Sequence, residues 1–455
     1  MMVPTTRLTL LTGMILLPAG VAAAWRSDWG PPAVMVAVVL LVVTLLDAVF
    51  SRAKLKPIII GVPDVVRLTA RHTARIRIQL RKPDRLVLRL RLGLALPAAV
   101  ASDQQDLSFQ LAAGVAEMNL AWPCRALQRG RFALTRCHLE TGSFLGLWAV
   151  RRTLAVASDI RVYPNLTSGQ QHLRGLFRRK EWGARTLRRI GKGREFEQLR
   201  DYLPGDSFED IEWKATARRR CPITKVYQVE QSQEIYVLLD ASRLSTRNAA
   251  YIMDRRSQSR IEDDRSETTI FERYLTAALV MAVVAEQLSD NYGLLVFGDK
   301  PEGFIKAGRG RAHYNACRDA LYSRMPRTVS PDFDELFAFV GTHVRKRALL
   351  VFLTSLDDPL LAESFIRAMQ AAVRQHILMV NMFRPPGAHP LFSSPRIRNI
   401  NGIYHHLVGH MQWVSIDETQ RRLKQRGAAL HLLDKDRLCS QLVSQYMEVK
   451  QRQIL

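Results

Sequence analysis

The sequence predicts an α/β protein in which a doubly wound sheet forms the C-terminal half. A small β-sandwich domain and an N-terminal transmembrane helical hairpin precede it. Two long apolar runs open the chain, short segments of alternating apolar and basic residues follow, and continuous apolar runs separated by helical segments occupy the remainder. Buried strands separated by helices are typical of a parallel sheet that is covered on both faces.

The composition excludes two classes of protein. Of the 455 residues, 47% are hydrophobic, so the chain has enough apolar surface to fold and is not disordered throughout. The five cysteines are sparse and none form a C-x-x-C pair, which excludes a small disulfide scaffold and a clustered zinc site. We expect free thiols in a reducing compartment. A disulfide between Cys124 and Cys137 is the alternative if their region is extracellular.

Residues 1–56 are predicted to form the transmembrane hairpin. Residues 8–24 carry no charge, and residues 31–50 carry only Asp47. Each run is close to the ~20 residues that cross the ~30 Å hydrocarbon core of a bilayer. The short turn between them contains Trp25 and Trp29, and tryptophan favours the membrane interface.

Basic residues predict the orientation of this hairpin. Arg7 precedes the first run, and three basic residues follow the second: Arg52, Lys54 and Lys56. Because basic residues concentrate in cytoplasmic segments, we expect both ends of the hairpin and the bulk of the chain to lie in the cytosol. The alternative is a signal peptide, since Arg7, the first apolar run and the alanines at 22–24 resemble one.

Residues 57–165 are predicted to form a β-sandwich-like domain. Residues 75–81 and 85–92 alternate between apolar side chains and mainly Arg with a period of two. In a strand with this period, the apolar side chains face a core and the arginines face water. Several short runs of this kind, separated by Gly and Pro, favour a small antiparallel sandwich.

A basic connector, residues 166–230, follows the predicted sandwich. Residues 174–194 contain nine Lys or Arg and one acid, Glu181, in a chain whose net charge is +24. Such a segment binds anionic lipid, a protein partner or nucleic acid. Because the hairpin already holds the chain at a membrane, we favour a lipid surface or a protein, and nucleic acid is the less favoured alternative.

Residues 231–455 are predicted to form the doubly wound α/β domain. A polar insertion near residues 247–267 interrupts it, and we interpret this insertion as a mobile surface segment. The predicted strands are 235–239, 293–297, 348–353, 377–383 and 428–433, and the predicted helices are 274–288, 360–373 and 436–450.

Polar side chains follow two of these strands. Asp240, Ser242 and Ser245 come after the first strand, and Ser355 and Asp357 come with Thr354 and Asp358 after the 348–353 strand. Ligands of such sheets bind at the carboxyl ends of the strands, and oxygen ligands of this kind suit Mg²⁺. The alternative is that these side chains cap the helices that follow.

A long motif at residues 193–218 resembles the signature of a known bacterial family. The segment reads GREFEQLRDYLPGD and continues into IEWKATAR, and residues 129–132, 144–148 and 162–164 are also similar to that family, domain of unknown function 58. The signature residues are Glu195, Phe196, Leu199, Arg200, Tyr202, Gly205, Asp206, Trp213, Lys214, Ala217 and Arg218.

The resemblance implies a von Willebrand factor A-like, Rossmann-like domain that often carries a metal-ion-dependent adhesion site. Asp240 and Ser242 match the D-x-S-x-S motif of that site, but Leu244 occupies the position of its second Ser and Ser245 comes one residue late. After the later strand, Leu356 follows Ser355 where the family motif has Asp, and Asp357 is displaced by one. The implied cofactor is Mg²⁺, held by a degenerate site.

The resemblance also implies partners and a location. Members of this family are often encoded beside MoxR-type AAA+ ATPases and are thought to assist the assembly or maturation of complexes. We therefore expect a multi-pass protein of the bacterial inner membrane, an adaptor whose cytosolic part binds a protein partner such as a MoxR-type ATPase.

The signature segment has a physical interpretation of its own. Its acids alternate with basic residues, and residues 204–206 are a turn signal. We interpret the segment as a charge-paired clamp between the two predicted domains, anchored by Trp213. A partner-docking surface is the functional alternative.

An enzyme is the second hypothesis. Asp206, Glu212 and Lys214 resemble the two carboxylates and lysine of a metal-dependent phosphodiester hydrolase. The spacing is short for such a site, and neither G-x-x-x-x-G-K-[ST] nor G-x-S-x-G occurs. We therefore predict a binding protein without catalytic residues.

Overall fold

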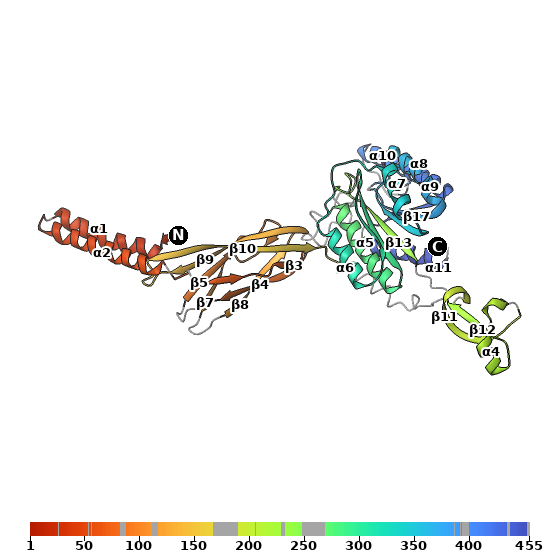
Figure 1. Cartoon of the computed structure of the whole chain (residues 1–455). Coiled ribbons are helices and arrows are strands. Elements are labelled where there is room, and N and C mark those ends of the chain that lie inside the picture. The colour runs from red at the N-terminus through yellow and green to blue at the C-terminus, as the bar shows by residue number, and fades with distance from the viewer. Residues whose placement is uncertain are drawn as a thin grey trace. The chain divides into compact units, whose positions relative to one another are not determined.

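The computed structural model describes two compact units, Met1–Asn165 and Leu166–Leu455 (Figure 1). It describes residues 1–452 except 26, 53, 56, 82–87, 112–116, 167–189, 205, 229–232, 248–268, 386, 392, 394–399 and 435–436. Most of the basic segment 174–194 and all of the polar insertion after Arg247 therefore lie outside the described residues.

Two apolar helices open the first unit. Helix α1 spans Thr6–Trp25, a 3-10 turn covers Ser27–Trp29, and α2 spans Gly30–Ser51 with prolines in its first turn. Proline suits a helix start because the first turn has no use for its missing N–H. By length and composition, both helices suffice to cross a membrane, as the sequence predicted.

Residues that precede α1 belong to the sheet that follows α2. Strand β1 (Met2–Pro4) pairs antiparallel with β10 (Trp148–Tyr163), with Met2 opposite Val150. The Met1 ammonium group donates a 2.9 Å hydrogen bond to the carbonyl of Arg151. The two ends of the helical pair therefore meet the same β-domain, as a hairpin requires.

Two sheets form the β-domain of this unit. The larger sheet has the order β1-β10-β9-β5-β7 with β3 also pairing β10, and the smaller has the order β2-β4-β8-β6. The remaining strands are β2 (Ile59–Gly61), β3 (Val65–Thr69), β4 (Thr73–Arg81), β5 (Leu88–Leu94), β6 (Val100–Ala101), β7 (Leu107–Leu111), β8 (Glu117–Ala126) and β9 (Gly130–Gly142).

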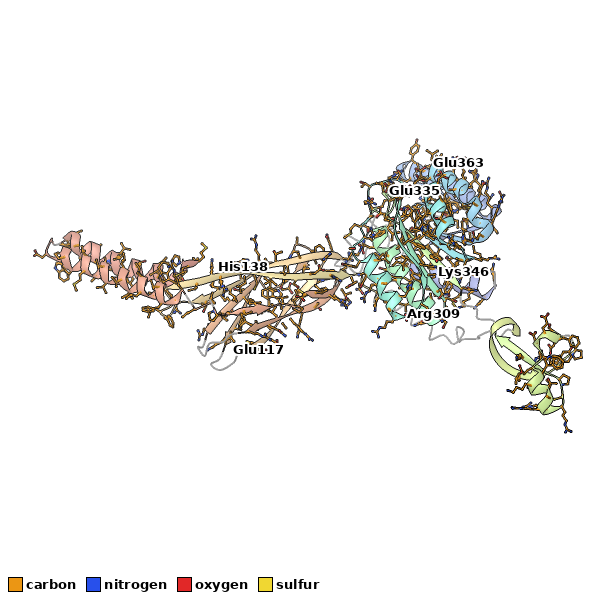
Figure 2. The ribbon with its side chains drawn as sticks, viewed as in Figure 1. Glu117, His138, Arg309, Glu335, Lys346 and Glu363 are labelled. Carbon is orange, nitrogen blue, oxygen red and sulfur yellow. The ribbon has the colours of Figure 1, made fainter. Side chains whose placement is uncertain are left out.

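Alternating side chains create the core between these sheets. On β4, Ile76, Ile78 and Leu80 are buried, whereas Arg75 and Arg77 are exposed. This period of two places one face of the strand inside and the other in solvent, as predicted. Figure 2 labels one residue of each sheet: Glu117 on β8 of the smaller sheet and His138 on β9 of the larger.

The second unit begins with a small module that carries the family signature. Strand β11 (Ile190–Asp201) pairs antiparallel with β12 (Ile223–Gln228), and between them lie a 3-10 turn (Phe208–Asp210) and helix α4 (Trp213–Arg219). Next to the turn predicted at 204–206, the Asp206 amide donates a 3.0 Å hydrogen bond to the Leu203 carbonyl.

A six-stranded sheet of order β15-β14-β13-β16-β17-β18 forms the rest of the unit. All neighbouring strands are parallel except β14 and β15. If the six strands are numbered in chain order from β13, their order across the sheet is 3-2-1-4-5-6. The order therefore reverses between β13 and β16, as in a doubly wound fold. The strands are β13 (Glu234–Asp240), β14 (Asn291–Phe297), β15 (Pro301–Gly308), β16 (Ala348–Leu353), β17 (Ile377–Phe383) and β18 (Ala428–Leu433).

Helices cover both faces of this sheet (Figure 1). Alternate residues of β13 enter two cores: Val237 packs with residues of α5, α6 and α11, and Leu238 packs with residues of α7, α8 and α10. The helices are α5 (Ile270–Gln287), α6 (Arg311–Leu321), α7 (Phe333–His343), α8 (Pro359–Ala368), α9 (Gln370–Gln375), α10 (Ile400–Gln425) and α11 (Leu438–Gln451). The predicted fold class is confirmed.

One predicted helix differs from the structure. The segment 360–373 forms α8 and α9 instead of a single helix, and they meet at buried Met369. Its ψ of −12° departs from the α-helical value of about −42°, and this interrupts the helix.

Candidate functional site

The candidate site is the edge of the sheet where β13 and β16 end. We call residues 240–247 and 354–360 the strand-end edge. Strand β13 lies between β14 and β16, and chain order reverses at this point. In doubly wound sheets the segments that leave such a point diverge and leave a crevice in which ligands bind.

Asp240 occupies the last position of β13 and is fully buried. Its Oδ1 accepts a 2.8 Å hydrogen bond from the Ser242 amide, and its Oδ2 accepts a 2.5 Å hydrogen bond from the Thr354 hydroxyl. Burial raises the pKa of Asp240, and the hydrogen bonds from Ser242 and Thr354 oppose that shift. Both carboxylate oxygens therefore already have partners inside the protein.

The two serines near Asp240 stabilise the local loop. The Ser242 hydroxyl accepts a 3.3 Å hydrogen bond from the Leu244 amide, and the Ser245 carbonyl accepts a 3.1 Å bond from the Phe271 amide. Both serines are buried. Leu244, which replaces the second Ser of the adhesion motif, is 1% exposed and therefore fills a core position.

The residues after β16 form a charged cluster. The Ser355 hydroxyl donates a 3.0 Å hydrogen bond to Asp357 Oδ1, and the Arg247 guanidinium donates a 2.6 Å bond to Asp357 Oδ2. Asp358 accepts a 3.0 Å bond from the Leu360 amide and so caps α8. The structure thus brings the predicted residues to one edge, but as an ion pair and a helix cap.

This arrangement does not fit a divalent cation. Asp240 is buried with both oxygens engaged, and the guanidinium of Arg247 already pairs with Asp357 and would repel a second cation there. Within the described parts of the chain, no group of three or more His, Cys, Asp or Glu is placed to hold a metal ion. The donor set of the adhesion motif therefore serves the protein's own contacts.

An apolar side chain stands among the charges of the strand-end edge. Leu360, in the first turn of α8, is 78% exposed. The half-exposed Arg243 donates a 3.1 Å hydrogen bond to the Ser330 hydroxyl and lies 4.0 Å from Asp358. The strand-end edge therefore presents one exposed leucine beside charged side chains.

The signature module has its own ion pairs. Arg200 pairs with Asp206 at 2.7 Å, and Asp206 also accepts a 3.0 Å hydrogen bond from the Leu203 amide. Glu212 pairs with Lys225, whose ammonium group holds the pKa of that carboxyl below its usual value. The two carboxylates of the proposed hydrolase thus have separate basic partners, and Lys214 is exposed.

The anchoring role of Trp213 stays a prediction. Its side chain is 69% exposed at the start of α4, and Phe208 is exposed as well. Lys214, Ala217 and Arg218 lie on the same short helix and are exposed, and Leu199 is exposed on β11. Tyr202 stacks on Phe208 with ring centroids 5.8 Å apart. Glu195 and Phe196 lie on β11 with undescribed side chains, and Gly205 lies outside the described residues.

Sequence reasoning missed three residues that define these surfaces. The predicted insertion includes Arg247, the sequence carries no signal at Lys225, and Leu360 is the first residue of a predicted helix. The signal for Leu360 is its position directly after the Asp358-Pro359 helix start, in the first turn of α8. The partners of Arg247 and Lys225 depend on contacts between segments that are distant in the sequence.

Comparisons with known proteins find a family match for part of the chain and similar folds among solved structures. Residues 198–388 match the family described as protein of unknown function DUF58, and no curated protein matches the chain. The von Willebrand factor A (VWA) domain of SpRpn10 aligns with 12% identity and a TM-score of 0.27, over 47% of this chain and 95% of that one. A PapD-like domain of human CEP192 aligns with 11% identity and a TM-score of 0.18, over 24% of this chain and 87% of that one.

The matched region begins in β11 and ends shortly after β17, so it contains the signature module from Gln198 onward and the strand-end edge, but not Glu195 and Phe196. This agrees with the family that the sequence resembled. Residues 198–388 are therefore similar to the DUF58 family, and they include five of the six strands of the doubly wound sheet, β13 to β17.

Proposed function

We propose that this chain is a membrane-anchored adaptor whose α/β domain binds a protein partner at the strand-end edge. The observation that carries the proposal is Leu360, 78% exposed among Arg243 and Asp358 at the point where strand order reverses. A solvent-exposed leucine costs free energy that a partner recovers by covering it, and the flanking charges supply orientation.

Two features support anchoring by the helical hairpin. Helices α1 and α2 are apolar enough to span a membrane, and β1 ties the segment before α1 to the same sheet that follows α2. A sheet strand before α1 argues against removal of that segment as a signal peptide. With Arg7, Arg52 and Lys54 at this side, the β-domain and the α/β domain lie in the cytosol, at the bacterial inner membrane.

A MoxR-type AAA+ ATPase is the partner that the family suggests. Binding would not require Mg²⁺, because Arg247 already supplies the positive charge beside Asp357. The exposed basic side chains of the signature module offer a second contact for an acidic surface of the same partner. The chain contributes a binding surface and no catalytic residue in this proposal.

The decisive experiment measures the affinity of the purified full-length chain for a purified, nucleotide-free MoxR-type ATPase from the same cell. Leu360→Asp should weaken binding at least about tenfold, as for a central interface residue. Leu127→Asp is the matched control, because Leu127 is an exposed leucine of the other unit. Undiminished binding by Leu360→Asp would refute the strand-end edge as the contact.

Two further arms separate the alternatives. Replacing Mg²⁺ by EDTA should leave the affinity unchanged, and a loss of binding would restore a metal-bridged contact through Asp240. A protease added outside intact cells should leave the C-terminal unit undigested, and its digestion would place this unit on the other side of the membrane.

Metal-dependent phosphodiester cleavage that Glu212→Ala abolishes would support the hydrolase instead.

A further inference from the structure

The turn between β9 and β10, residues 143–147, packs against the last two helical turns of α2. The Leu145 amide donates a 3.1 Å hydrogen bond to Asp47 Oδ1, and the Phe144 amide donates a 3.2 Å bond to the Ser51 hydroxyl. The Trp148 indole donates a 2.9 Å bond to the carbonyl of Thr44. These contacts extend from Thr44 to Ser51, which is seven helical rises or about 10 Å at 1.5 Å each.

The backbone of this turn is satisfied almost entirely by protein groups. Five of the six amides from residue 143 to residue 148 have protein acceptors. Those of Phe144 and Leu145 bond to α2, as described above. Those of Ser143, Gly146 and Trp148 bond to groups of the same segment at 2.7, 3.3 and 3.0 Å. The Thr5 hydroxyl donates to the carbonyls of residues 146 and 147 at 2.9 and 2.8 Å. A turn in water needs no such partners, whereas a turn at the hydrocarbon of a bilayer requires them.

The side chains at the tip of the turn are apolar and face outward. Phe144 and Leu145 are 60% and 59% exposed. Together with Asp47 they line a shallow groove of ≈ 400 Å³ whose other walls are residues of α2: Val43, Leu46 and Phe50. The apolar tip therefore continues the exposed apolar surface of a helix that is long enough to span a membrane.

A basic and an aromatic side chain mark the rim of this surface. The Lys54 ammonium lies 3.7 Å from the centroid of the Phe144 ring and donates a 3.1 Å hydrogen bond to the Gly142 carbonyl. Burial lowers the pKa of Lys54, and the Asp47 charge opposes that shift. Lysine and tryptophan at the end of an apolar helix are typical of the boundary between hydrocarbon and headgroups.

We infer that the β9–β10 turn enters the inner leaflet, where Phe144 and Leu145 contact lipid acyl chains. Asp47 and Ser51 are positioning residues, because their side-chain oxygens accept hydrogen bonds from the amides of the turn. At that depth no water competes for these amides. The length of α2 agrees: 22 residues span about 33 Å, so the level of Thr44 lies within a ~30 Å hydrocarbon core. The turn is then a third membrane contact that holds the β-domain at the bilayer.

Site-specific photocrosslinking tests this inference on the full-length chain in vesicles of phosphatidylethanolamine and phosphatidylglycerol. A benzophenone amino acid at Leu145 should yield a lipid adduct in mass spectrometry. The same group at Leu127 is the matched control, because Leu127 precedes β9 and β9 separates the two positions by about 43 Å at ~3.3 Å per residue. Adducts only to protein at position 145, or equal lipid adducts at both positions, would overturn the inference.

Asp47 variants provide the second test. Asp47→Asn retains an oxygen acceptor and should preserve both the lipid adduct and slow hydrogen exchange of the Leu145 amide. Asp47→Ala removes the acceptor, still inserts as an apolar helix, and should accelerate that exchange at least about tenfold. Unchanged exchange and unchanged adducts in Asp47→Ala would contradict the positioning role.

Discussion

Thr354 and Asp240 are 114 residues apart in the chain and meet in a 2.5 Å hydrogen bond at the carboxyl ends of β16 and β13. The bond is fully buried and joins the two strands between which the order of the sheet reverses. It explains why a polar pair persists in a core: each group satisfies the other, and neither has access to water. The pair thereby holds the base of the strand-end edge.

Removal of the Thr354 hydroxyl should loosen this edge. Thr354→Val leaves one oxygen of a buried carboxylate without a partner, which costs about 1.5–3 kcal/mol for a bond to a charged group. Hydrogen exchange in the full-length chain should therefore accelerate in peptides from β13 and β16 but not in the β-domain. Thr354→Ser keeps the hydroxyl and should behave as the wild type; equal exchange in both variants would contradict the assigned bond.

Mg²⁺ should not stabilise the wild-type strand-end edge. The Arg247 guanidinium occupies the position beside Asp357 from which a metal would be held, so added Mg²⁺ or EDTA should leave exchange in β13 and β16 unchanged. Arg247→Gln frees Asp357, and only in that variant do we expect Mg²⁺ to slow exchange. A Mg²⁺ effect on the wild type would show that the edge opens to accept the ion.

His376 should make the stability of the α/β domain depend on pH. The imidazole is buried at the start of β17, and burial lowers its pKa below the usual value. The unfolded chain then binds a proton more readily than the folded chain, so stability falls as the pH drops below about 6.5. Exchange or melting measured from pH 8 to 5 should show a weaker pH dependence in His376→Leu.

The control for this experiment is His405→Leu, because His405 is exposed on α10. That variant should retain the wild-type pH profile. His431 contributes a slope of the same sign, since burial also lowers its pKa, so His376→Leu reduces the dependence without abolishing it. A profile of His376→Leu that is identical to the wild type would contradict the prediction.

Asp290 should hold the C-terminal helix in place. Its fully buried carboxylate accepts hydrogen bonds from the Gln233 amide at 3.0 Å, the Tyr446 hydroxyl and the Lys450 ammonium at 2.6 Å. Lys450→Met removes the cation from a buried charge and should destabilise α11 by about 3 kcal/mol, which exchange of the α11 amides measures.

The matched control for Lys450→Met lies on the same helix. Arg452 pairs with Glu448 one turn apart, but both side chains are exposed. Arg452→Met should therefore change stability by about 0.5 kcal/mol or less. If the two variants shifted α11 exchange equally, the buried Asp290 cluster would not be the stabilising contact.

Strands with a regular apolar pattern followed from the sequence, and two elements without such a pattern did not. The strands β16, β17 and β18 coincide with the predicted segments because every or nearly every side chain in such strands is apolar. The antiparallel edge strand β15 is partly buried at every position except the exposed Lys306, and α10 has apolar residues on its exposed side. Neither shows the burial pattern on which sequence periodicity depends.

The candidate site divides in the same way. Asp240 and the residues at 354–358 were expected together because carboxyl ends of parallel strands share one edge of a sheet. The Arg247–Asp357 pair and the Asp47 contacts with the β9–β10 turn join residues 110 and 98 positions apart. Local pattern contains no information on such partners, which the packing of whole elements selects.

The apolar hairpin, the alternation of strands and helices in the α/β domain and the DUF58 resemblance were thus properties of the sequence alone, because apolar periodicity, charge and motif are local features. Tertiary structure decided what the polar residues do. It buried the adhesion-type aspartate against Thr354, gave Asp357 an arginine, and placed Asp47 beneath a turn. Those outcomes depend on which side chains meet at van der Waals distance once the sheets close, and charge neutralisation and hydrogen bonding are settled only there.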